Sequence, residues 1–144
     1  MKKFLITMAI VVTSLCSFAS DVDVNVSVLS SFQKEFAGAK EVQWTVAGDN
    51  YKASFVFNNQ YVYAFFTAQG ELMGITRNMT SLELPVALQA SLKKDYNEYW
   101  ISNLFEISNA DGVHYYITLE KADTKLILSS TSSSWNLYKK ASKI

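Results

Sequence analysis

The chain has 144 residues with 13 basic and 13 acidic side chains, so its formal net charge is zero. It has no run of basic residues, which argues against a nucleic-acid-binding protein and against a basic helix that lies on a membrane surface. Aromatic residues make up 14% of the chain and proline occurs once, which is typical of a folded, sheet-rich domain. The length predicts a single compact domain.

The first 19 residues have the layout of a secretory signal peptide. Two lysines precede an apolar run that is too short for a stable membrane span, and small residues at Ser17 and Ala19 fit a cleavage site. Cleavage after residue 19 removes Cys16, the single cysteine, and leaves 11 basic against 13 acidic residues, a net charge of −2. The sequence therefore predicts a periplasmic or secreted protein that is stabilised by packing, without disulfides.

A lipoprotein signal is the alternative interpretation of the same segment. Cys16 would then carry the lipid, and the chain would be anchored to a membrane surface. Such signals place a small residue before the cysteine, whereas Leu15 stands there. Cleavage without lipidation is therefore the preferred prediction.

A helix is predicted over residues 24–39. Its apolar residues follow one another at intervals of four, one, three and four, which is helical spacing, and Gly38 ends the pattern. Those residues are Val24, Val28, Leu29, Phe32 and Phe36.

The apolar period then changes to two, which predicts four strands at residues 42–46, 51–57, 61–67 and 72–77. Short turns at residues 48–50, at Asn58-Asn59 and at Gln69-Gly70 separate them. Strands joined by such turns form an antiparallel meander.

The second half of the chain follows the same plan. Pro85 opens a second helix, in which Leu84, Leu88, Leu92 and Tyr96 share one face. Strands are predicted at residues 100–107, 113–119, 125–130 and 135–138.

The two halves predict an α+β fold in which one unit, a helix plus a four-stranded antiparallel meander, occurs twice. Phe32 and Phe36 correspond to Leu92 and Tyr96, each 60 residues later. The domain would span residues 20–144, with repeats at about 24–80 and 81–140. Chance similarity of two amphipathic helices is the alternative explanation.

Two-residue turns would fix which side chains share a face of the first meander. They place an apolar set on the core face, under the helices: Tyr51, Ala53, Phe55, Val62, Ala64, Phe66, Met73 and Ile75. The opposite face receives a mixed set with a band of aromatics: Lys52, Ser54, Val56, Tyr61, Tyr63, Phe65, Thr67, Leu72 and Thr76. A three-residue turn at Asn58 would exchange the two faces.

The exposed face is the candidate binding site, and Lys52, Ser54, Tyr61, Tyr63 and Phe65 are its candidate residues. Tyr and Phe supply the large contact area that protein-binding surfaces favour. The alternative is that these rings only stabilise the sheet through cross-strand pairs.

No pattern in the sequence predicts a catalytic, metal or cofactor site. His114 is the single histidine and lies in a predicted strand, where a surface role is more common than a catalytic one. One histidine and no mature cysteine are too few for a zinc site, and neither a calcium loop nor a phosphate-binding glycine motif occurs. The prediction is a protein that is not an enzyme.

An ordered set of residues extends from the first helix to the start of the second: Phe32, Phe36, Ala39, Val42, Trp44, Tyr51, Phe55, Tyr63, Gly70, Leu84 and Pro85. With this set, the first half of the chain resembles the PepSY-like, β-lactamase-inhibitor-like group of small secreted proteins of Bacteroidetes-type bacteria. The resemblance implies the tandem fold and the binding of a partner by a concave sheet surface. Ala37 replaces a proline that is common in the group, and the second half fits more loosely.

The functional prediction is a periplasmic or secreted binding module for an envelope or secreted protein or peptide. One alternative is a small-ligand carrier or an enzyme with a pocket between the repeats, lined by Trp44, Tyr51 and Trp100. The other is a structural envelope protein that self-associates through its sheet edges.

Overall fold

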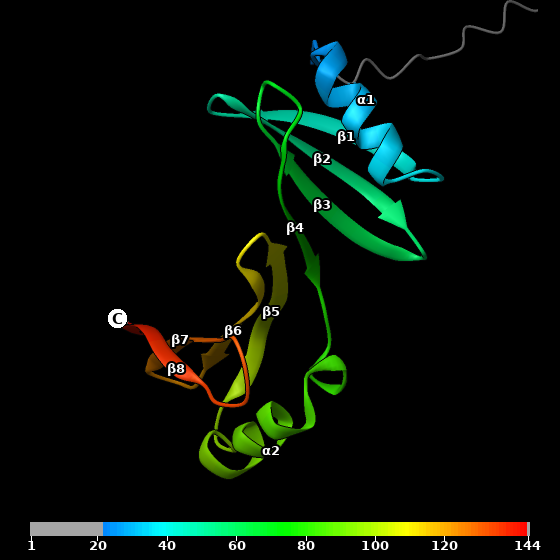
Figure 1. The fold of residues 1–144 in the computed structure, drawn as a ribbon. Coiled ribbons are helices and arrows are strands. Elements are labelled where there is room, and N and C mark those ends of the chain that lie inside the picture. The colour runs from blue at the N-terminus through cyan, green and yellow to red at the C-terminus, as the bar shows by residue number, and fades with distance from the viewer. Residues whose placement is uncertain (1–21, 144) are drawn as a thin grey trace, which may run out of the picture.

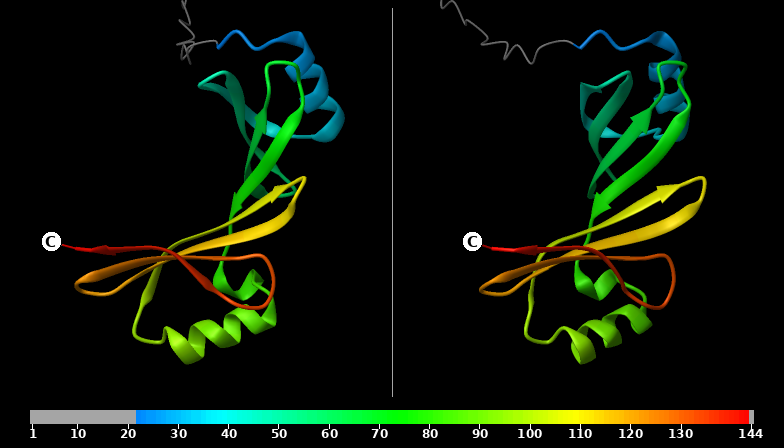
Figure 2. Two further views of the ribbon diagram at one scale, coloured as in Figure 1. Left: turned by 60° about the vertical axis from the view of Figure 1, so that its left-hand side comes forward. Right: turned by 90° about the vertical axis from the view of Figure 1, so that its left-hand side faces the viewer.

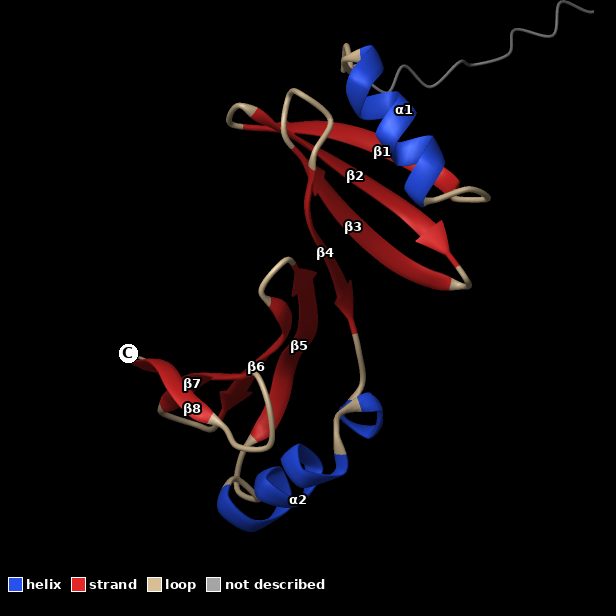
Figure 3. Cartoon of the chain, in the orientation of Figure 1, coloured by secondary structure: helices blue, strands red, loops and turns tan. Residues whose placement is uncertain are grey.

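The computed structural model describes residues 22–143. The predicted signal peptide, its cleavage position and Cys16 lie outside the described residues. Two α-helices and a short 3-10 helix accompany one antiparallel sheet of eight strands, which are neighbours in chain order (Figure 1; Figure 3). The elements are α1 (Val26–Glu35), β1 (Lys40–Ala47), β2 (Asn50–Phe57), β3 (Gln60–Phe66), β4 (Leu72–Asn78), η1 (Ser81–Glu83), α2 (Val86–Asp95), β5 (Trp100–Asn109), β6 (Gly112–Glu120), β7 (Thr124–Ser130) and β8 (Asn136–Ser142).

Helix α1 is shorter than the predicted span of 24–39 because Asn25 caps it. The Asn25 side-chain oxygen accepts a hydrogen bond of 3.1 Å from the backbone N–H of Ser27, which satisfies a free donor of the first turn. The helix ends before Phe36, whose N–H bonds to the Phe32 carbonyl. Val24 lies outside the helix but still packs against the core.

The first core lies between α1 and strands β2 and β3. Phe32 of α1 meets the fully buried Phe55 ring edge-on, with 4.9 Å between ring centroids. Ala53 pairs with Ala64 and Phe55 with Val62, as the two-residue turn predicts. The predicted core face of this hairpin is therefore confirmed.

The prediction that Met73 lies on the core face was wrong. Thr67 N–H donates to the Glu71 carbonyl at 2.9 Å, so the loop is longer than the predicted turn at Gln69-Gly70. A bulge between Phe65 and Phe66 then pairs Phe66 with Leu72 instead of Met73. Met73 is consequently 47% exposed and does not enter the core.

The second core lies under α2, with Leu88 fully buried at its centre. The remaining buried members are Leu84, Leu104, Ile117, Leu119, Leu126 and Leu128. Trp135, which was predicted to begin the last strand, precedes β8, and its indole N–H donates to the Leu88 carbonyl at 3.2 Å. This tryptophan therefore ties the β7–β8 loop to α2.

The register places both helices on the same side of the sheet. Side chains directly opposite each other on paired strands share a face, and one such line crosses four strands: Val62, Arg77, Glu106 and Tyr115. Leu104, Ile117 and Leu128, which pack on α2, belong to that same face. The sheet bends between its halves, and the helices lie outside the bend (Figure 2). We call the opposite side the open face, because no described helix covers it.

The turn between β3 and β4 packs against the first turn of α1. Gly70 has φ +90°, and a Cβ atom at this position would lie 2.6 Å from the Ser27 carbonyl oxygen. The Asn25 amide also donates to the Ala68 carbonyl at 3.1 Å. Gly70 is therefore required both by its backbone conformation and by the close approach of the helix.

Gly38 provides a matched control for this contact, since it has φ +88° but a Cβ atom at this position would meet nothing within 4 Å. We expect Gly38→Ala to lower the free energy of unfolding by about 1–2 kcal/mol through backbone strain. Gly70→Ala should lower the free energy of unfolding by about 1–3 kcal/mol more than Gly38→Ala does, because the methyl group also displaces α1. Urea unfolding of the two variants measures the difference, and equal losses would show that the turn does not press on the helix.

Candidate functional site

The five predicted site residues lie together on the open face. Lys52 is directly opposite Phe65, and Ser54 is opposite Tyr63. The Tyr61 and Tyr63 rings pack edge-on with 5.6 Å between centroids. We call Tyr61, Tyr63 and Phe65 the first aromatic cluster.

Lys52 lies over the first aromatic cluster. Its Nζ is 4.4 Å from the Tyr63 ring centroid and 6.0 Å from that of Phe65. An ammonium over an aromatic face is attracted to the negative face of the ring, which holds the flexible lysine side chain in place. The cluster therefore presents a positioned positive charge between aromatic rings.

A second aromatic cluster, which the sequence analysis missed, lies on the same face in the other half of the sheet. The two halves meet between β4 and β5, and we call this junction the seam. The second aromatic cluster consists of Phe105, Tyr116 and Tyr138. Phe105 and Tyr116 stack at 5.4 Å, and Tyr138 meets Tyr116 edge-on at 5.6 Å. The alternation that turns Tyr115 and Ile117 toward the second core also places Tyr116 on the opposite face, so this signal was present in the sequence.

Several side chains of the open face are partly buried although no described helix covers them. Tyr61 is 46% exposed, whereas Tyr63, Phe65, Phe105 and Tyr116 are half-buried by one another and by neighbouring strands. Thr118 in β6 is only 8% exposed, although no helix in the described chain covers it. The open face lies on the inner side of the bend of the sheet (Figure 2).

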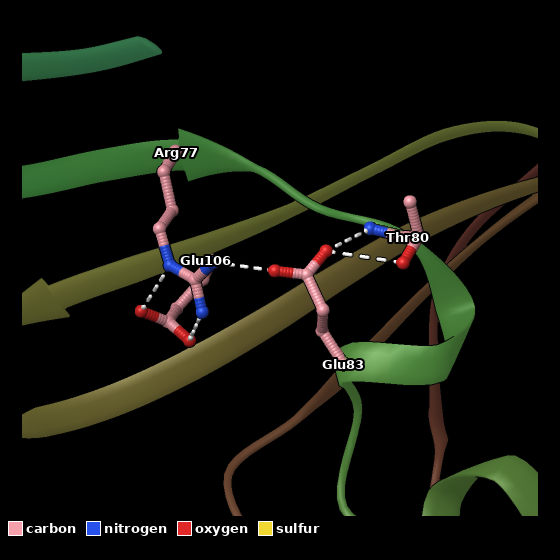
Figure 4. A network of polar contacts seen from close by, with 4 residues as sticks. All are labelled: Arg77, Thr80, Glu83 and Glu106. Atoms are coloured by element: carbon pink, nitrogen blue, oxygen red, sulfur yellow. Dashed lines mark hydrogen bonds and ion pairs between the residues drawn. The ribbon is translucent and has the colours of Figure 1, made fainter. Parts of the chain in front are cut away.

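The seam between the two halves is held by a polar network on the helix side (Figure 4). Arg77 of β4 makes two hydrogen bonds to Glu106 of β5, at 3.3 and 3.2 Å, and a third to Glu83 of η1 at 2.9 Å. The other Glu83 oxygen accepts from the N–H and hydroxyl of Thr80, at 2.6 and 3.1 Å. The network thereby joins β4, β5 and η1.

The charges of this network stabilise one another. Hydrogen bonding to Glu106 raises the pKa of Arg77 above its ordinary value. The hydrogen bond from the Thr80 backbone, followed by that from Arg77, lowers the pKa of Glu83. The β4–β5 ladder beside the network has four residue pairs, from Ile75 to Asn78, so the network reinforces a short ladder.

Hollows lined by apolar side chains flank both helices. The larger, of about 580 Å³, lies beside α2 and is lined by residues that include Leu82, Val86 and Tyr96. The other, of about 320 Å³, lies beside α1 and includes Trp44.

Trp44, Tyr51 and Trp100, which the small-ligand alternative places around one pocket between the repeats, do not come together in the structure. Trp44 and Tyr51 pack against the first core, whereas Trp100 is 52% exposed in the other half, with the Lys143 Nζ 4.7 Å from its ring centroid. Helix α1 packs on strands of the first core, whereas α2 packs on β5, β6 and β7, so the three side chains lie in different halves.

Other functional groups are scattered in the described residues. His114 lies on the open face opposite Ile107, without an acidic neighbour across the strand. Residues 22–143 contain no group of three or more His, Cys, Asp or Glu side chains placed to hold a metal ion. Within this range, neither helix has the length and apolar character needed to cross a membrane.

Comparison with solved structures identifies the fold. The chain superposes on a BLIP-like (β-lactamase-inhibitor-protein-like) protein from Bacteroides fragilis with a TM-score of 0.71 and 16% identity, covering 85% of this chain and 89% of that one. A DUF2874 family protein from Bacteroides ovatus gives a TM-score of 0.74 at 19% identity, with 84% and 89% covered. A candidate periplasmic protein from Bacteroides eggerthii gives 0.71 at 18% identity, with 83% and 88% covered.

These likenesses establish a shared BLIP-like fold, an eight-stranded antiparallel sheet with two helices. Comparisons with protein families and with curated proteins find no match. At identities below 20%, the solved structures carry the fold and not the activity.

The Arg77 network predicts a specific pH dependence. The lowered pKa of Glu83 stabilises the fold above the unfolded-state value of about 4.3, and this contribution is lost as the pH falls through the folded-state value. We expect Glu83→Gln to lower the free energy of unfolding at pH 7 by about 1 kcal/mol. Urea unfolding at pH 7 and pH 3 should show that this loss shrinks in acid.

Glu98→Gln is the control, since Glu98 is exposed and precedes β5 outside the network. It should leave the free energy of unfolding nearly unchanged at both pH values. A Glu83→Gln loss that is equal at pH 7 and pH 3 would contradict the stabilising role of the carboxylate.

Proposed function

We propose that this protein is a periplasmic or secreted binding module without enzymatic activity, which recognises a protein or peptide through its open face. Lys52, Ser54, Tyr61, Tyr63 and Phe65 are the proposed contact residues. The observation that carries the proposal is an aromatic sheet face that no described helix covers. Buried aromatic anchors supply most of the energy in protein interfaces, whereas solvated sheet faces are usually polar.

The second aromatic cluster enlarges the proposed surface. Thr76 of β4 lies between Tyr63 and Ile107, so the open face is continuous from β3 to β5. A partner could therefore contact both clusters at once. The proposed periplasmic or secreted location is supported by the signal-like leader and by the neighbour from Bacteroides eggerthii.

We further propose that the fold arose by doubling of one PepSY-like unit. Helices α1 and α2 each have ten residues and begin at Val26 and Val86, and β1 and β5 begin at Lys40 and Trp100. Each of these two strands also has a bulge near its start, after Lys40 and after Ile101. The equal spacing supports the doubling, which would place the open face across both units.

A small-ligand carrier is the second candidate function, and the hollow of about 580 Å³ beside α2 favours it. Its apolar lining would suit a hydrophobic molecule. A ligand retained in native mass spectra, and lost in a Tyr96→Ala variant, would support this candidate over the binding module.

The double variant Tyr61→Ala/Tyr63→Ala tests the proposed binding face. We expect it to remain folded, because cross-strand pairs contribute only about 0.2–1 kcal/mol each. It should lose at least tenfold in affinity for a partner captured from an envelope extract by the unchanged protein. Titration of that partner against both proteins measures the loss.

Leu82→Ala/Val86→Ala is a matched control, because these side chains are 82% and 80% exposed on the α2 side. It removes apolar surface away from the open face and should leave partner affinity unchanged. Unfolding of the tyrosine variant would instead mean that the rings belong to the core, and undiminished affinity would place the contact elsewhere.

A further inference from the structure

We propose that the partner presents an acidic segment, in which a carboxylate pairs with Lys52 while apolar side chains pack on the first aromatic cluster. This inference rests on the proposed binding function of the open face and specifies the chemistry of its partner.

The charge of the open face differs from that of the whole chain. The chain carries equal numbers of basic and acidic residues. At the positions of β2 to β7 that the register places on the open face, the basic residues are Lys52 and Lys125, and the acidic residue is Glu120. Lys139 of β8 adds a further positive charge opposite Ile127. The open face is therefore net positive.

Glu120 does not offset the charge of Lys52. Its carboxylate is bonded to Lys143 and lies 3.9 Å from Lys125, and the hydrogen bond from Lys143 lowers its pKa. Among residues 22–143, no carboxylate forms an ion pair with Lys52. Lys52 is thus a positive charge that an incoming anion can pair with.

The rings around Lys52 make such a pairing favourable. Tyr63 and Phe65 hold its ammonium and partly exclude water, so less side-chain freedom is lost on binding. A partner that covers the cluster excludes more water, and attraction between opposite charges is stronger there than in bulk water. A carboxylate flanked by apolar groups matches this combination of charge and rings.

The ring geometry favours a protein segment over an acidic polysaccharide. Tyr61 and Tyr63 meet at 65°, and Phe105 and Tyr116 stack on each other, so these rings form packed ridges instead of a flat platform for a sugar. Three strand spacings separate β3 from β6, which is about 14 Å, so a segment of about five extended residues would reach from one cluster to the other.

Selection of random twelve-residue peptides displayed on phage against the purified protein tests this inference. The expected result is enrichment of peptides that combine Asp or Glu with Leu, Phe or Tyr. A synthetic enriched peptide should bind at least tenfold more weakly to Lys52→Glu, and selection on Lys52→Glu should enrich basic peptides instead. Affinity for the unchanged protein should fall as salt rises.

Lys121→Glu is the matched control, because its Nζ also lies over an aromatic ring, 5.1 Å from the Tyr99 centroid, outside the open face. It makes the same charge change and should leave peptide affinity unaltered.

The remaining outcomes separate the two proposals. Enrichment of neutral or basic peptides that depend on Tyr61 and Tyr63 would overturn the acidic partner and leave the binding face standing. No enrichment above that on the double tyrosine variant would overturn both. Binding of polygalacturonate that Lys52→Glu abolishes, without any acidic peptide, would overturn the assignment to a protein segment.

Discussion

The alternation of side chains across a continuous antiparallel sheet is the constraint on which this structure depends. Seven successive strand pairings connect the eight strands. Because directly paired residues share a face, the register places Phe55 in β2 and Leu128 in β7 on the same side of the sheet. Because both helices need an apolar surface to cover, they lie on the same side. Among residues 22–143 no helix covers the opposite side, and both aromatic clusters lie on it.

The seam between β4 and β5 connects the two cores. It has a short ladder, and Arg77 and Glu106 occupy the helix side where apolar residues fill both flanks. A bidentate pair has a defined geometry, and Glu83 adds a link to η1, which precedes α2. The polar network thus restrains the bend of the sheet. That bend sets the relative placement of the first and second aromatic clusters.

The local chemistry of the turns made the faces of the first hairpin predictable from the sequence. Features that depend on pairing between distant segments were not predictable in this way. Asn58 and Asn59 both have positive φ, 49° and 62°, which is the conformation of a tight hairpin, so their turn correctly placed Ala53 and Phe55 in the core. The bulge that exposes Met73 leaves no comparable signal in the sequence. Pairing of Arg77 with Glu106 joins residues 29 positions apart, and alternation alone does not identify this partner. The candidate face was therefore predictable in its first cluster, whereas its extension across the seam required the fold.

The bulge at the start of β1 has a consequence for growth of the sheet beyond a single chain. Strand β1 is one of two free edges, and its bulge between Lys40 and Gln43, with Glu41 at φ +53°, interrupts the regular row of backbone donors and acceptors. Strand β8, at the other edge, exposes Lys139 and Lys140, whose charges repel a like strand. Bulges and charged lysines are features by which natural sheets disfavour the docking of another chain's strand at an edge.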